Sequence, residues 1–105
     1  MPGKWKYQLV LQFSGSSIED FDRLIEIENA IGNGLGKGAF LDGHDFGSGE
    51  GDIFIHTDEP NPTFQKALQL LDEATRNKLR SAYRELKGEK YTVLWPPSLK
   101  EFKLM

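Results

Sequence analysis

The stretch WKYQLVLQF, residues 5–13, alternates between apolar and polar side chains with a single break at Val10. A period of two places successive side chains on opposite faces of an extended chain. This stretch therefore predicts a strand with one buried face and one face turned away from the core. The side expected to face the core carries Trp5, Tyr7, Leu9, Leu11 and Phe13.

A helix is predicted directly after this strand. Ser16, followed three residues later by Glu19, fits a capping box, in which two side chains satisfy the first free N–H groups of a helix. Apolar residues then recur every three or four positions through residues 18–31. The helix should end near Gly32, because the glycine-rich chain over residues 32–38 does not propagate a helix.

The remaining chain predicts three further strands. Residues 39–45 and 52–57 form two of them, joined by a glycine-rich hairpin loop. A helix begins at Asn61-Pro62, and a further helical segment covers residues 76–86, where apolar residues repeat at three and four. Residues 91–95 form the last strand, and we expect the tail, residues 98–105, to be loosely ordered.

This order of elements predicts one α+β domain over residues 1–105. Strand, helix, strand, strand, helix, strand is the order of the ferredoxin-like split βαβ sandwich, a four-stranded antiparallel sheet with helices on one face. Right-handed crossovers place both helices on the same side of the sheet. The other face should therefore be wet or covered by a partner.

Composition excludes several classes of protein. The chain has no cysteine, which excludes a disulfide scaffold, a thiolate zinc site and a cysteine nucleophile. A net charge of −3 makes nucleic acid an unlikely partner, although the basic stretch over residues 76–90 leaves RNA contact as a weaker alternative. No apolar run reaches the length of a membrane span, and the polar first residues do not form a signal peptide. We therefore expect a soluble, cytoplasmic domain with no membrane partner.

The densest polar stretch is residues 42–52, and His56 follows it closely. Alternation along residues 52–57 puts the even-numbered side chains on the open face, and pairing across the hairpin brings part of the strand over 39–45 opposite them. A change of register by one residue would scatter this set. The predicted contact surface is this open face with the acidic hairpin, and its candidates are Asp42, His44, Asp45, Glu50, Asp52, Phe54 and His56.

Two functions fit this surface. The first is a small binding or regulatory domain without a cofactor, contacting a protein partner or its own copy in a homodimer, with the acidic patch suited to a basic partner. The alternative is a small metal-dependent or acid–base enzyme, because imidazole and carboxylate groups one strand apart can bind a divalent cation or transfer protons. His44, His56 and Asp42 are then the candidate metal ligands, and His44, Asp45 and His56 the candidate catalytic residues. A polar outer face of a hairpin has the same composition, so we expect binding rather than catalysis.

Several motifs together point to relatives. Residues 43–50 read GHDFGSGE, residues 53–58 read IFIHTD, and AYREL and YTVLWP follow at residues 82–86 and 91–96. With the hairpin pattern GHDxGSGE…IFIxTD, the chain resembles a group of short bacterial single-domain proteins of uncharacterised function. The resemblance implies a stand-alone small domain and assigns no activity or catalytic residue.

Overall fold

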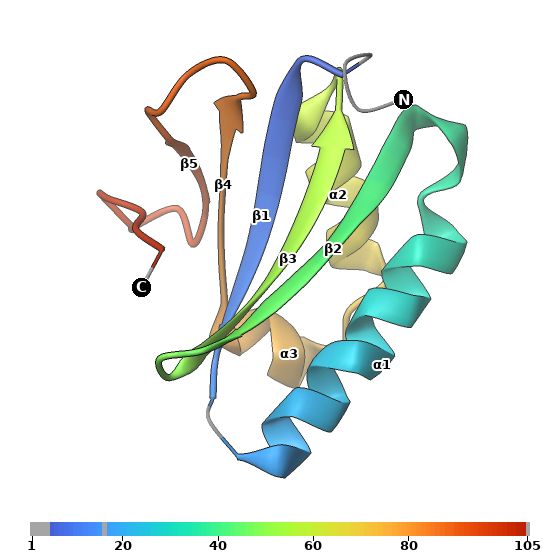
Figure 1. Ribbon diagram of the computed structural model, residues 1–105, viewed down its shortest axis with the longest axis vertical. Helices are drawn as coiled ribbons and strands as arrows, with labels where there is room; N and C mark the ends of the chain where they lie inside the picture. Colours follow the sequence, from blue (N-terminus) through green and yellow to red (C-terminus); the bar gives the residue numbers. More distant parts are fainter. Residues whose placement is uncertain (1–4, 16, 105) are drawn as a thin grey trace.

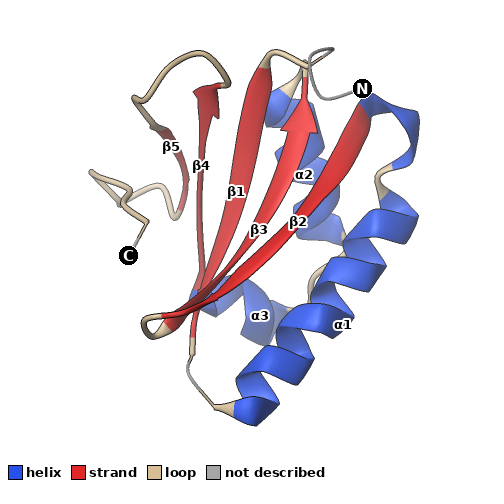
Figure 2. Cartoon of the chain, viewed as in Figure 1, coloured by secondary structure: helices blue, strands red, loops and turns tan. Residues whose placement is uncertain are grey.

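The computed structural model describes residues 5–15 and 17–104. Figures 1 and 2 show the strands side by side in one sheet, with the helices packed behind it. Within the described ranges, no helix is long and apolar enough to cross a bilayer. The elements in chain order are β1 (Tyr7–Ser14), α1 (Ile18–Gly34), the short 3-10 helix η2 (Gly36–Gly38), β2 (Ala39–Gly47), β3 (Glu50–Thr57), α2 (Pro60–Gln69), α3 (Glu73–Lys78), β4 (Leu79–Glu85) and β5 (Thr92–Trp95).

The sheet has the strand order β2-β3-β1-β4-β5, and each neighbouring pair is antiparallel. The predicted α+β class with an antiparallel sheet is confirmed. The predicted count of four strands is wrong, because the described sheet has five. β1 lies at the centre, so both of its edges are paired, one with β3 and one with β4.

The additional strand is β4, which the sequence predicted as part of a helix over residues 76–86. The short helix α3 ends at Lys78, and the chain from residue 79 onward is extended. The apolar residues of this stretch are spaced three and four apart, as in a helix. A segment of only seven residues can nevertheless also form a strand. The residues form a strand because β4 pairs with the edge of β1 that β3 leaves free. The Ser81 hydroxyl also donates a hydrogen bond to the Val10 carbonyl at 2.7 Å. Arg80 therefore lies on a strand and not on the basic helix that RNA contact would have used.

The start of α1 is capped one residue later than predicted. The Ser17 side chain accepts a hydrogen bond from the Asp20 N–H at 3.0 Å, and the Asp20 carboxylate accepts one from the Ser17 N–H at 3.1 Å. The predicted box used Ser16, which lies outside the described residues, and Glu19. The capping principle is thus confirmed with a different pair of residues.

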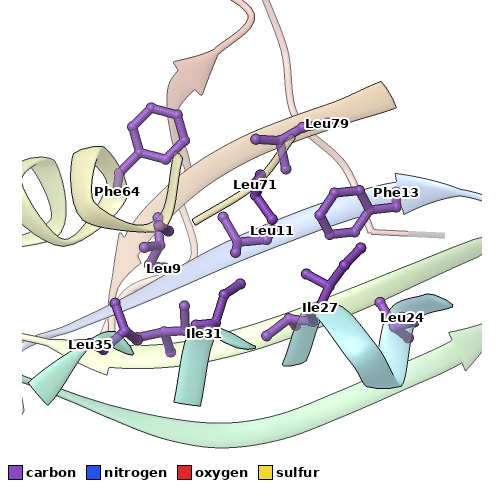
Figure 3. Close-up of a cluster of buried hydrophobic side chains, with 13 residues drawn as sticks. Leu9, Leu11, Phe13, Leu24, Ile27, Ile31, Leu35, Phe64, Leu71 and Leu79 are labelled. Carbon is purple, nitrogen blue, oxygen red and sulfur yellow. The ribbon is translucent and has the colours of Figure 1, made fainter. Parts of the chain in front are cut away.

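One apolar core fills the space between the sheet and the helices, as Figure 3 shows. β1 contributes Leu9, Leu11 and Phe13, as the alternation predicted, whereas Trp5 and Tyr7 of the same predicted side are half-buried and lie outside this cluster. Burial of each leucine or isoleucine contributes about 2 kcal/mol to stability. The helices contribute the residues that face the sheet. The buried set is Leu9, Leu11, Phe13, Leu24, Ile27, Ile31, Leu35, Ile53, Ile55, Phe64, Ala67, Leu71 and Leu79.

The opposite face of the sheet is partly covered by the chain itself. A second cluster on this face joins Val10 of β1 and Ala82 of β4 to Phe102, which follows β5. The Gln12 side-chain amide donates to the Lys103 carbonyl at 2.9 Å and so attaches the same segment to β1. Residues 96–104, which we call the C-terminal segment, therefore lie over the β1–β4 half of this face, whereas β2 forms the far edge of the sheet (Figure 1). The expectation of a wholly uncovered face is corrected for that half.

Candidate functional site

β2 and β3 form the predicted hairpin. Ser48 and Gly49 close it, and both have positive φ values, 56° and 83°. Two positive φ values in a two-residue turn give a twist that matches that of the paired strands. The turn therefore fixes the pairing of the two strands at their near ends, where Gly47 lies opposite Glu50.

A bulge interrupts β2 between Leu41 and Gly43. Leu41 pairs with Ile55, but Gly43 pairs with Phe54, so β2 carries one extra residue at this point. Gly43 has a φ of 105°, which residues with a side chain rarely adopt. An extra residue shifts the alternation of the strand beyond it, so His44 faces the helices instead of the open face.

His44 contacts α1. Its Nδ1 lies 3.0 Å from Oε1 of Glu28, and its ring packs edge-on against Phe21 with 5.9 Å between ring centroids. Phe21 also packs against Phe46, the next residue of β2 on this side, at 5.3 Å. His44 thus belongs to the contact between the edge strand and α1.

His56 lies on the other face of the sheet, on β3. Its Nε2 is 3.2 Å from Oδ2 of Asp42, and its ring lies 6.1 Å from that of Phe40. The residue is 6% exposed, and its Nδ1 is buried without a hydrogen-bond partner among the described residues. Nε2 of His56 is occupied by Asp42, and Nδ1 has no partner in the described ranges but is closed off from solvent. Neither nitrogen is therefore placed to transfer a proton to a substrate.

The two histidines therefore lie on opposite faces of the sheet, and the common metal or acid–base centre that the enzyme alternative required is not formed. Asp45 does not complete it either, because it pairs with Asp52, four residues along β3 from His56. At about 3.3 Å per residue this separation is about 13 Å. Among the described residues, no group of three or more histidine and acidic side chains is placed to hold a metal ion.

Glu50 and Asp52 form a carboxyl pair that is buried, although the sequence predicted both as exposed contact residues. They are 7% and 5% exposed. Burial, followed by a hydrogen bond with Glu50 and its charge, raises the pKa of Asp52 from 3.8 to about 7. Gln12 donates to Glu50 Oε2 at 3.0 Å as well as to the Lys103 carbonyl, so the carboxyl pair, the central strand and the C-terminal segment form one network. No local pattern marks Gln12, because its partner Lys103 is 91 positions away.

The exposed part of the predicted surface follows β2. Asp42 and Asp45 are exposed, whereas the predicted contact residue Phe54 on β3 is half-buried against the cluster of Val10, Ala82 and Phe102. Phe40, which is 41% exposed, is absent from the predicted contact residues, although an apolar residue on the outer side of a strand is a recognisable signal. We call Phe40, Asp42 and Asp45 the acidic β2 face.

Comparison with known proteins gives no match: no family model fits the chain, and neither a curated protein nor a solved structure matches it significantly. The resemblance to short bacterial proteins stays a prediction.

Proposed function

We propose that this chain is a binding domain whose acidic β2 face contacts a basic protein partner. The observation that carries the proposal is the exposed ring of Phe40 on the same face of β2 as the carboxylates Asp42 and Asp45. Asp42 and Phe40 both contact His56, and Asp45 lies further along the strand, on the edge of the sheet farthest from the C-terminal segment. Aromatic side chains contribute much of the binding energy in protein interfaces. Charges around such an anchor select the partner and speed its association.

The charge on the acidic β2 face favours a basic partner. Asp45 lies opposite Asp52 in the β2–β3 ladder, so its carboxylate adds to the negative potential of the Glu50–Asp52 pair. A lysine or arginine that approaches Asp45 from solvent therefore meets more than one negative group. An acidic partner would meet repulsion at the same place.

A second copy of this chain fits the same edge less well. Two β2 strands paired edge to edge would bring the acidic residues of both copies together, which disfavours pairing. The bulge at Gly43 also interrupts the row of backbone groups that such a pairing uses. We therefore favour a different, basic protein over a homodimer.

The enzyme alternative has no comparable support, because it needs His44 and His56 at one place. We also infer that the fold is a ferredoxin-like sandwich extended by one strand. With η2, α3 and β5 left out, the elements follow the β-α-β-β-α-β order of that sandwich. β5 pairs with β4, and the C-terminal segment continues from it across the reverse face.

Affinity capture on the immobilised chain, with sedimentation of the purified complex, tests the proposed function. A basic protein should be retained, and its retention should weaken as salt rises. Phe40→Ala, and Asp42→Asn combined with Asp45→Asn, should each lower retention at least about tenfold. Leu70→Ala is the matched control, because Leu70 is 38% exposed but follows α2 on the helix side of the sheet.

Two results would contradict the proposal. The first is equal retention of the partner by the Phe40→Ala and Leu70→Ala chains, which would place the interface elsewhere. The second is a chain that retains no basic protein and sediments as a dimer. That dimer would point to a second copy as the occupant.

A further inference from the structure

A pocket of about 380 Å³ opens between α1 and α3, on the helix side of the sheet. Its floor is apolar and consists of core side chains, among them Phe13, Leu24 and Ile27. Small-molecule sites range from about 300 to 1,000 Å³. This pocket is at the lower end, so it suits a ligand with one ring or a short chain.

The rim of the pocket is charged and joins the two helices. Arg23 of α1 donates from Nη2 to Asp72 Oδ2 and to Thr75 Oγ1, both at 3.0 Å. Asp72 also accepts a hydrogen bond from the Thr75 N–H at 2.8 Å and caps α3. The hydrogen bonds from Thr75, together with the charge of Arg23, lower the pKa of Asp72. Arg23 and Asp72 thus form an ion pair with each other.

Asp20 and Lys78 are the other two charged residues on the rim. Asp20 accepts the hydrogen bond from the Ser17 N–H at the start of α1. Lys78, in the last turn of α3, is exposed and forms no ion pair with any described residue. Lys78 is therefore the cation of this rim that a ligand can pair with, and it lines the same pocket as the apolar floor.

We propose that this pocket binds a small carboxylate with an apolar body. The body packs against Phe13 and Leu24, which removes apolar surface of both molecules from water. The carboxylate accepts charge-assisted hydrogen bonds from the Lys78 ammonium group. This site is separate from the acidic β2 face and does not depend on the partner proposed there.

An amide NMR titration of the whole chain tests the site, with phenylacetate and hexanoate as probes and phenylacetamide as the uncharged comparison. Both carboxylates should shift the signals of Gly15, Gly51 and Ala74, which line the pocket. Lys78→Gln should weaken phenylacetate about fivefold, the loss expected for one partly exposed charge contact, and leave phenylacetamide unchanged. Lys87→Gln, at another exposed lysine, is the matched control and should change neither.

A second variant, Ala74→Leu, fills the pocket from an exposed position on α3 and should abolish binding of all three probes at unchanged Tm. The proposal is overturned if neither carboxylate shifts the pocket signals, or if phenylacetamide binds as well as phenylacetate. Binding that survives Ala74→Leu would also overturn it. The pocket would then be a gap in the packing between two helices.

Discussion

Replacing Asp52 with asparagine should change how the stability of this protein depends on pH. In the folded protein, burial and Glu50 raise the pKa of Asp52 to about 7, whereas in the unfolded chain the pKa returns to about 3.8. Between these values the unfolded chain binds fewer protons than the folded protein, so the free energy of unfolding falls as the pH rises. Above about pH 7 the fall is complete, because Asp52 is then ionised in both states. The Asp52→Asn chain has no proton to lose at this position.

The magnitude follows from the two pKa values. Each pH unit between them corresponds to about 1.4 kcal/mol, so a rise from 3.8 to about 7 sets an upper bound of about 4 kcal/mol. Movement of the ionised carboxylate toward water reduces this cost, and we expect about 2 kcal/mol. Asparagine has nearly the same shape and can still hydrogen-bond to Glu50. The variant should therefore match the wild type near about pH 4 and be more stable by about 2 kcal/mol near about pH 8.

Urea denaturation followed by tryptophan fluorescence at several pH values measures this difference. Asp22→Asn, which removes an exposed carboxylate from α1, is the matched control and should leave the pH dependence of the wild type unchanged. Parallel curves for the wild type and Asp52→Asn between about pH 4 and pH 8 would refute the reasoning. They would mean that Asp52 is ionised in the folded protein throughout this range.

Two further substitutions test the bulge and the C-terminal segment. Gly43→Ala should lower the free energy of unfolding by about 1–2 kcal/mol. At a φ of 105° the strain is in the backbone, because an added Cβ would meet nothing within 4 Å, and unchanged stability in urea would contradict the bulge. Phe102→Ala should lower the free energy of unfolding by about 3 kcal/mol. The reason is that the ring is buried with Val10 and Ala82 and lies 5.0 Å from the ring of Tyr91. A thermal unfolding measurement that gives less than about 1 kcal/mol would show that the segment does not cover the sheet in solution.

The buried side of β1 could be predicted from the sequence because a single period of two runs through residues 5–13. The hairpin could also be predicted, since its turn residues are local signals. β4 could not, because its apolar residues fit a helix as well as a strand. The stretch becomes a strand because it pairs with β1, which precedes β4 by more than 60 residues in the chain.

The candidate site could be predicted only up to the bulge. One extra residue in β2 moves His44 to the helix side, and its only local mark is Gly43, one of four glycines in residues 39–51. The buried Glu50 is joined through Gln12 to the C-terminal segment, which carries no strand or helix pattern. The pocket was also out of reach, because its lining comes from β1, α1, β2, β3 and α3.

The central place of β1 has a consequence for how the chain reaches this structure. Tyr7 pairs with Thr57 and with Glu85, which are 50 and 78 positions further along. Closing such long loops costs chain entropy before any pairing energy is gained, so folding of this sheet should take milliseconds to seconds. The hairpins β2–β3 and β4–β5 can form within about 10 microseconds. We therefore expect the apolar strand β1 to stay unpaired longest. Aggregation should then begin from residues 5–13 while the protein folds.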